Sequence, residues 1–146
     1  MALPKTLGEL KASGWKSRSV REELRQNLLK GLEAGTNLFP GLVGYDDTVL
    51  PQLYNAVLAR HHFLLLGLRG QAKTRLLRSL TGLLDEAMPV IQDSPLNEDP
   101  YHPVLRASVA RAAADGDNLA IDWMPRDARY QEKLATPDVS MADLIG

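Results

Sequence analysis

The segment from His61 to Thr74, HHFLLLGLRGQAKT, constrains the fold more than any other part of the chain. Its unbroken apolar run FLLL ends at a glycine, which is typical of a short strand buried on both faces of a parallel sheet. A helix is predicted from about Lys73 to Ala87, and Pro89 closes it. The leucines expected on its inner face are Leu76, Leu77, Leu80, Leu83 and Leu84. This strand–turn–helix order predicts an α/β fold of three layers, with FLLLG as a central parallel strand between helices.

An amphipathic helix is predicted in the first thirty-five residues. Ser19 stands three residues before Glu22, which is the spacing of a capping box at a helix start. An apolar stripe recurs every fourth residue, and Gly35 is expected to end the helix. The stripe consists of Val20, Leu24, Leu28 and Leu32. This pattern indicates a helix that docks on a neighbouring element through one face.

Further elements are predicted on both sides of the central segment. A helix is expected from about residue 47, with Pro51 in its first turn, where a missing N–H does little harm. Downstream, PVIQD and NLAIDW are typical of strands, and a helix is predicted from near Pro103 to Gly116. Near the end of the sequence, Ser140 stands three residues before Asp143, which indicates another helix start.

The composition excludes several classes of protein. The chain has 146 residues, which suit one ordinary domain, and it is 45% hydrophobic and 24% charged. Seventeen basic and eighteen acidic residues give a net charge of -1, so a non-specific nucleic-acid binder is not expected. The absence of cysteine excludes disulfides, a thiol nucleophile and a cysteine zinc site. The longest apolar run is far short of a bilayer span, and no signal peptide is recognised, so a cytoplasmic protein is expected.

The residues from Gly67 to Thr74 match the phosphate-binding pattern G-x-x-x-x-G-K-[ST], except that Ala72 replaces the second glycine. In such a loop, successive backbone N–H groups from Gly70 onward surround phosphate oxygens at the positive end of a helix dipole. Lys73 would contact the β- and γ-phosphates, and the Thr74 hydroxyl would coordinate Mg²⁺. Because position 72 falls at a helix start, where ordinary dihedral angles suffice, one methyl group is a mild change. The alternative is a simple strand-to-helix turn with a surface lysine.

These residues carry a resemblance to a known family. The stretch LVGYDDTVLPQLYNAVLARHHFLLLGLRGQAKT resembles the opening of the AAA+ ATPase core, in particular the MoxR and magnesium-chelatase motor-subunit branch, where the loop commonly ends in A-K-T. The tail ATPDVSMADLIG resembles the T-P-D…D-[IL]-x-G segment of that branch. The upstream SVREELRQNLLKGLEAGTNLFPGLVGYDD is similar to the lead-in of magnesium-chelatase-like proteins. The resemblance extends over most of the chain, from about Ser19 to Gly146.

The resemblance implies a domain organisation and a set of site residues. Residues 1–36 would be an N-terminal helical lead-in, and residues 37–146 the first part of a P-loop AAA+ core. Val43 and Gly44 would border the adenine, although a turn before a helix is the plainer interpretation of that pair. The phosphate loop would comprise Gly67, Gly70, Gln71, Ala72, Lys73 and Thr74.

The resemblance also implies a function. ATP and Mg²⁺ would be bound, and hydrolysis in a homo-oligomeric ring would drive metal insertion or remodel a partner. The partners would be subunits of a metal chelatase or another metalloenzyme, with no role for nucleic acid or membrane. Which of these partners applies is left open by the sequence.

Hydrolysis further requires a Walker B strand that supplies an aspartate to Mg²⁺ and a glutamate to water. Asp85–Glu86 imitates that pair but is expected to be an exposed charge pair on the leucine-striped helix. Asp122 lies on a predicted strand, but Trp123 occupies the glutamate's position.

Other polar residues fit no catalytic pattern. The candidate arginine fingers are Arg126 and Arg129, which are expected to be solvated on a polar loop. Three histidines, His61, His62 and His102, have no metal-ligand spacing.

The missing parts favour an N-terminal piece of a longer motor, whose Walker B, sensors and lid would follow Gly146. Such a piece is predicted to be inactive by itself. The alternative is a shortened regulatory or assembly module that binds nucleotide, or keeps only the loop's shape, and does not hydrolyse it.

Overall fold

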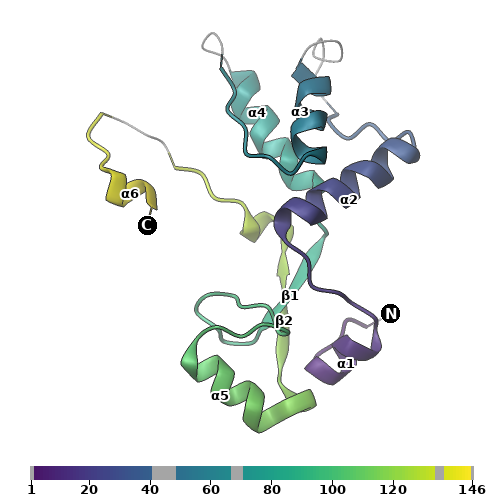
Figure 1. Cartoon of the computed structure of the whole chain (residues 1–146), viewed down its shortest axis with the longest axis vertical. Coiled ribbons are helices and arrows are strands. Elements are labelled where there is room, and N and C mark those ends of the chain that lie inside the picture. Colours follow the sequence, from purple (N-terminus) through teal and green to yellow (C-terminus); the bar gives the residue numbers. More distant parts are fainter. Residues whose placement is uncertain (1, 41–48, 67–70, 134–136, 146) are drawn as a thin grey trace.

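The computed structural model describes residues 2–40, 49–66, 71–133 and 137–145, with backbone alone at 71–72 and 144–145. Figure 1 shows two groups of helices joined by a long two-stranded ribbon, with α2, α3 and α4 above and α1 and α5 below. The helices are α1 (Leu7–Ala12), α2 (Val20–Glu33), α3 (Val49–Leu58), α4 (Gln71–Ser79), α5 (Arg106–Asp115) and α6 (Met141–Ile145). The strands are β1 (Ala87–Ile91) and β2 (Ile121–Pro125), and short 3-10 turns are η1 (Leu80–Leu83), η2 (Gly116–Asn118) and η3 (Arg126–Arg129). None of the described helices combines the length and apolar character that a membrane span requires.

The upper group packs around one apolar core. Its buried members are Phe39, Leu50, Leu53, Leu76 and Leu83. They come from α3, α4, η1 and the segment after α2, so the core holds three helices in contact although their sequences are separated by loops. The rings of Phe39 and Tyr54 stack with centroids 5.9 Å apart, which adds to the area that they remove from water.

The predicted stripe on α2 is buried only in its middle. Leu28 is fully buried and Leu24 packs against the upper core, whereas Val20 is 54% and Leu32 is 42% exposed. The helix begins as predicted, because the Ser19 hydroxyl accepts the Glu22 N–H at 3.2 Å. The expectation of one continuous apolar face is therefore wrong at both ends, since α3 and η1 contact α2 over only part of its length.

The ribbon pairs β1 and β2 antiparallel, with Pro89 opposite Trp123 and Ala87 opposite Pro125. The N–H of Arg126 donates to the Glu86 carbonyl, and hydrogen bonds alternate along an antiparallel pair. Positions 89 and 125 therefore direct their backbone groups outward, where proline's missing N–H breaks no bond of the ladder. Both outer edges thus lack a donor, which hinders the addition of a third strand.

The lower group is built on the far end of the ribbon. Leu7, Ile91 and Leu119 form its buried core, and the N-terminal segment bridges to β2 through Thr6 and Ala120. The Trp123 indole donates to the Pro4 carbonyl at 2.7 Å. Residues near the start of the chain are therefore fixed against a strand more than a hundred positions away.

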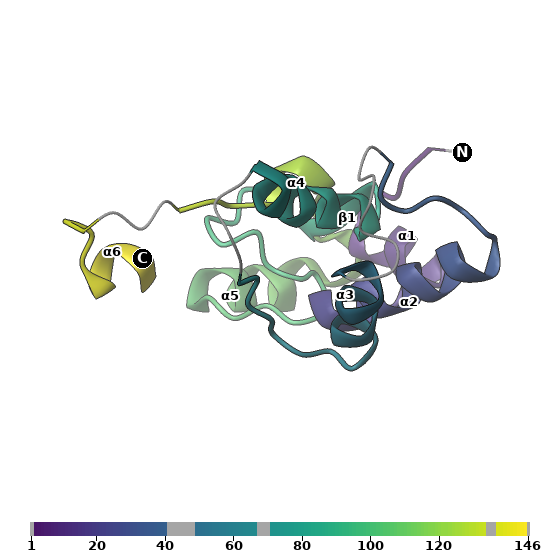
Figure 2. The same cartoon turned by 90° about the horizontal axis from the view of Figure 1, so that it is seen from above.

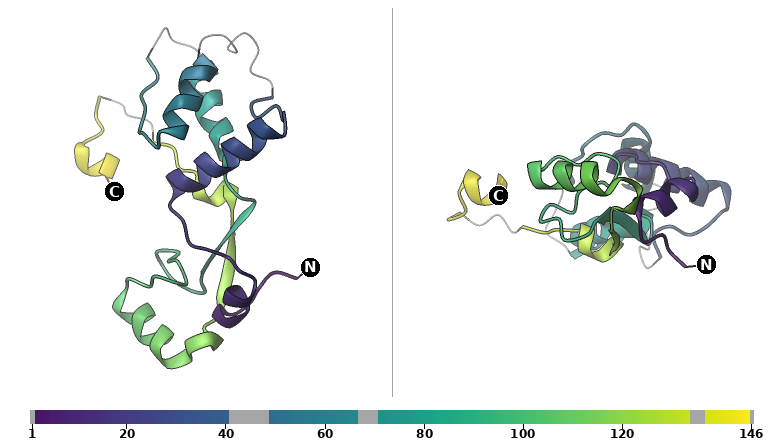
Figure 3. Two further views of the ribbon diagram at one scale, coloured as in Figure 1. Left: turned by 45° about the vertical axis from the view of Figure 1, so that its right-hand side comes forward. Right: turned by 90° about the horizontal axis from the view of Figure 1, so that it is seen from below.

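The elements predicted at positions 47, 103–116 and 140 are confirmed. Pro51 lies in the first turn of α3, and α5 ends at Gly116, whose φ of 55° is the left-handed conformation that favours glycine. Before α6, the Ser140 hydroxyl accepts the Asp143 N–H at 3.3 Å, and the Asp143 carboxylate accepts the Ser140 N–H at 3.0 Å. In Figures 1–3 this short helix lies apart from the two groups.

The helix predicted over 73–87 is shorter than expected. The α-helical part ends at Ser79, η1 continues to Leu83, and the chain is extended from Leu84 into β1. Leu76 and Leu83 are buried as predicted, but Leu77 is 37% exposed. The leucine repeat alone does not distinguish one long α-helix from a shorter α-helix followed by a 3-10 turn and a strand.

The strand expected at FLLLG is not formed. The described part of this segment, Phe63–Leu66, has neither helix nor strand, and Leu64 and Leu66 are 80% and 84% exposed. A central parallel strand requires partners on both sides, whereas the described sheet contains only β1 and β2, paired with each other. The three-layer core remains a prediction, since helices around a two-stranded ribbon neither require nor exclude it.

Candidate functional site

The start of α4 holds the described part of the predicted phosphate loop. Lys73 is half-buried and Thr74 is exposed in the first turn of the helix, which contains no acidic residue. Leu76, one turn onward, is 5% exposed and packs into the upper core, so it fixes the orientation of this turn. The backbone N–H groups of a helix start, together with a lysine and a threonine, fit a Mg²⁺-bound polyphosphate chemically.

The other residues assigned to this site lie wholly or partly outside the described residues. Val43, Gly44, Gly67 and Gly70 are among the positions without a description, and the side chains of Gln71 and Ala72 are likewise outside it. Gln71 is the first residue of α4, so the helix begins two residues before the start predicted at about Lys73. Figures 1 and 2 show α3 and α4 side by side, and both helices begin at the same end of the upper group.

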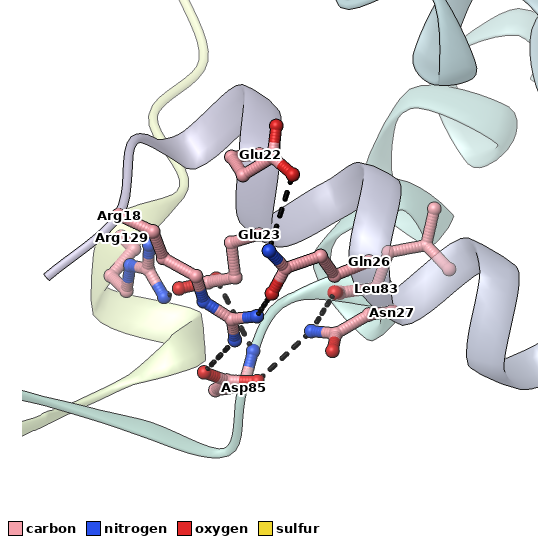
Figure 4. Close-up of polar contacts among 8 residues, drawn as sticks. All are labelled: Arg18, Glu22, Glu23, Gln26, Asn27, Leu83, Asp85 and Arg129. Atoms are coloured by element: carbon pink, nitrogen blue, oxygen red, sulfur yellow. Dashed lines mark hydrogen bonds and ion pairs between the residues drawn. The ribbon is translucent and has the colours of Figure 1, made fainter. Parts of the chain in front are cut away.

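A buried polar cluster lies where the upper group meets the ribbon (Figure 4). We define it by the residues Arg18, Glu23, Asn27, Asp85 and Arg129. Glu23 and Arg129 form an ion pair at 2.8 Å in which each side chain is 6% exposed. The same Glu23 oxygen accepts the Asp85 N–H at 3.3 Å. The Asp85 carboxylate accepts from Asn27 at 2.9 Å and pairs with Arg18 at 2.5 Å. The cluster thus ties α2 to the chain before β1 and to η3.

The environment of Asp85 keeps its carboxylate charged. Burial alone would raise the Asp85 pKa, but hydrogen bonds from Asn27 and Arg18 and the charges of Arg18 and Arg129 outweigh it, so the pKa is lowered. No buried side-chain nitrogen or oxygen in the described parts of the chain lacks a partner. The cluster is therefore fully satisfied, which is the condition under which buried charges can be held without a large penalty.

Two expectations about these residues are wrong. Asp85 is not part of an exposed helical charge pair: it follows η1 in extended chain and is partly buried, and only Glu86 is exposed. Arg129 is not solvated, because it is buried against Glu23. Arg126 is intermediate, with one bond to the Gly82 carbonyl at 3.3 Å. Neither arginine lies at the start of α4, since both belong to η3 at the end of the ribbon.

The two aspartates that imitate Walker B do not approach Thr74. Thr74 lies in the first turn of α4, and Asp85 lies beyond the opposite end of the same helical stretch, a separation of roughly 15 Å along the axis. Asp122 is exposed on β2, opposite Val90. Among the residues with described positions, no group of three His, Asp or Glu could hold a metal ion.

The loop before α5 brings together Ser17, Asp99 and His102. The Ser17 hydroxyl donates to Asp99 Oδ2, and His102 Nδ1 lies 3.3 Å from the same oxygen. In a hydrolytic triad the imidazole stands between the carboxylate and the hydroxyl, so that it can take the hydroxyl proton. Here the carboxylate stands between them, and this arrangement does not activate the serine. Elsewhere in the described chain, the His62 ring contacts the guanidinium of Arg21.

A second buried carboxylate, Glu98, caps α5. One of its oxygens accepts the N–H groups of Val104 and Leu105 at 2.6 and 2.7 Å, and the other accepts the hydroxyls of Ser94 and Ser108. These bonds, led by that from Ser108, lower the Glu98 pKa to about 2. Sequence analysis missed this residue, and its spacing of four to ten positions from its partners is not a helix-capping pattern that could have revealed it.

A cavity of about 50 Å³ lies beside the polar cluster, where Trp15, Met88 and Asp99 border it together with Arg18 and Asp85. Pockets that hold small molecules usually have volumes of about 300–1,000 Å³. The cavity is therefore too small for a nucleotide.

Comparison of the chain with protein-family models, with curated proteins and with solved structures gives no match.

Proposed function

We propose that this chain is the ATP-binding portion of a AAA+ ATPase of the MoxR and magnesium-chelatase motor branch. The observation that carries the proposal is the position of Lys73 and Thr74 in the first turn of α4, directly after a glycine-containing loop in the sequence. The dipole and the backbone N–H groups of a helix start favour a polyphosphate at this position. The lysine supplies a point charge to the phosphates, and the threonine hydroxyl is a ligand that Mg²⁺ accepts.

The wider biology of the proposal follows the sequence resemblance. In a homo-oligomeric cytoplasmic ring, binding and hydrolysis of ATP would drive metal insertion by a chelatase subunit or remodel another metalloenzyme. The two-stranded ribbon and α5 separate the two predicted motor segments, GLRGQAKT and TPDVSMADLIG, in the sequence. The lower group is therefore the region in which a partner-specific role is expected.

A second candidate is a nucleotide-binding regulatory or assembly module that does not hydrolyse ATP. The observation that favours it concerns Asp85, which lies far from Thr74 along the helix. Its carboxylate is already bound by Arg18 and Asn27. Asp122 does not match a Walker B aspartate either. It lies on strand β2 of the ribbon, and Trp123 follows it where the glutamate would stand. Within the described residues, no carboxylate pair is placed to orient water at the start of α4.

Binding of a fluorescent ATP analogue to the full chain in the presence of Mg²⁺ tests the nucleotide site. We expect Lys73→Ala to abolish binding, because it removes the charge that contacts the phosphates. Arg75→Ala is the matched control, since Arg75 is an exposed cation on the same helix outside the motif, and it is expected to leave affinity unchanged. Equal affinity of the unaltered chain and the Lys73→Ala variant would remove the assignment.

A further inference from the structure

Packing of α2 against α3 gathers cations from two distant parts of the sequence. We call Arg21, Arg25, Arg60 and His62 the basic cluster. Arg21 bonds to the His62 ring, and Arg25 Nε donates to the Leu58 carbonyl at 3.1 Å. The Arg60 side chain is 60% exposed, and Arg21 and His62 are exposed as well. The side chains of Arg21 and Arg60 therefore face solvent, and Arg25 between them is partly buried.

Among the residues that the structure describes, one carboxylate is bonded to this surface. Glu22 lies 3.2 Å from Arg60 and 3.8 Å from Arg25, so one carboxylate is shared by two guanidinium groups. Three arginines and one glutamate leave a formal excess of two positive charges, even with His62 neutral. This excess is local, because the whole chain has a net charge of -1.

The backbone at Arg60 is unusual for an arginine. The Arg60 N–H donates to the Val57 carbonyl, and the His61 N–H donates to the Ala56 carbonyl, which together form a Schellman motif at the end of α3. Arg60 occupies the left-handed position of this motif, with a φ of 61°. The corresponding position after α2 is Gly35, with a φ of 65°. Glycine is the residue that usually fills this position, since it has no Cβ penalty.

Folding stability does not account for arginine at this position. The left-handed conformation costs a non-glycine residue about 1 kcal/mol. The ion pair with Glu22 is largely exposed, and exposed pairs contribute only about 0–1 kcal/mol. The ion pair therefore offsets at most this cost and gives no net stabilisation, whereas strained backbone positions are often retained where a side chain has a function.

We propose that the basic cluster is a docking surface for an acidic, carboxylate-rich segment of a partner protein. The shared Glu22 carboxylate demonstrates that a carboxylate fits between these guanidinium groups. The cluster spans about one turn of α2, which matches a short peptide rather than the series of phosphates that a nucleic-acid backbone presents. This proposal does not depend on nucleotide binding at α4.

Fluorescence anisotropy with a labelled polyglutamate peptide and the full chain at low ionic strength tests the proposal. We expect saturable binding that Arg60→Gly weakens about tenfold, since a hydrogen bond to a charged group contributes about 1.5–3 kcal/mol. Arg60→Gly should not lower the thermal unfolding temperature, because glycine suits the left-handed position. Arg21→Gln should weaken binding similarly, without altering the backbone at position 60.

Lys30→Ala is the matched control, because Lys30 is an exposed cation in the last turn of α2 outside the cluster. We expect it to leave polyglutamate affinity unchanged. The proposal is overturned if polyglutamate does not bind, if Lys30→Ala weakens binding as much as Arg60→Gly, or if duplex DNA binds more tightly than polyglutamate. Retention of full affinity by both arginine variants would overturn it as well.

Discussion

The carboxylate of Glu23 lies 2.8 Å from the guanidinium of Arg129, although 105 residues separate them in the sequence, and both side chains are 6% exposed. This ion pair joins the first turn of α2 to the turn that follows the ribbon. It also holds the backbone of Asp85, whose N–H donates to Glu23. The orientation of the upper helices relative to the ribbon therefore depends on charged groups as well as on apolar packing.

Removal of either partner of this pair should strongly destabilise the chain. We expect Arg129→Ala to lower the free energy of unfolding by about 3–5 kcal/mol, because it leaves the Glu23 carboxylate buried without its counter-ion. Urea unfolding followed by circular dichroism measures the change. Arg78→Ala is the control, since it removes an exposed pair with Glu132 and should have a much smaller effect on stability. Equal effects of the two substitutions would contradict the burial of the Glu23–Arg129 pair.

The stability of the lower group should depend on acid pH through Glu98. Hydrogen bonds from Ser108, Ser94, Leu105 and Val104 lower its pKa from 4.5 to about 2 in the folded chain. Because the folded pKa is depressed, the stabilisation is present above pH 4.5 and is lost as the pH falls from 4.5 towards 2.

Acid titration of the unaltered chain and of Glu98→Gln, followed by the α-helical signal, tests this dependence. The glutamine variant cannot titrate at this position, so it should lose less stability between pH 4.5 and 2. Parallel pH profiles of the two proteins would mean that the Glu98 carboxylate does not contribute to acid unfolding.

The chain as given should show no ATP hydrolysis above background. Among the described residues, neither a carboxylate that could orient water nor an arginine that could stabilise the transition state lies at the start of α4. An arginine finger alone accounts for about 10³–10⁵ in rate. A phosphate-release assay with Lys73→Ala as the control measures this. Turnover that disappears in the variant would show that Asp85 or Asp122 serves as a substitute and would favour a complete motor within this chain.

The amides of Phe63–Leu66 should exchange with solvent faster than that of Val90. This segment has no strand partner in the described sheet and Leu64 and Leu66 are mostly exposed, whereas Val90 is 5% exposed within the ribbon. Hydrogen–deuterium exchange resolved by residue distinguishes the two. Protection of Leu64–Leu66 equal to that of Val90 would support the buried strand that the apolar run predicts.

Local sequence was sufficient to predict several helix ends. Ser19 caps α2 and Ser140 caps α6 through bonds to residues three positions away, and Gly116 ends α5 in the conformation that glycine favours. These interactions involve neighbours in the sequence, so spacing alone reveals them. The start of α4 was predicted only to within two residues, at about Lys73 rather than at Gln71.

The tertiary structure decided which polar and apolar groups are buried. Apolar character predicted burial of Leu64 and Leu66 and polar character predicted exposure of Arg129, and the structure reverses both. Burial depends on which distant segment covers a residue, and here Glu23 meets partners 62 and 106 positions away. The antiparallel pairing of β1 and β2 likewise depends on contacts across more than thirty residues. A periodic pattern specifies a helix face or a strand face, but the element that packs on that face is determined only when the whole chain folds.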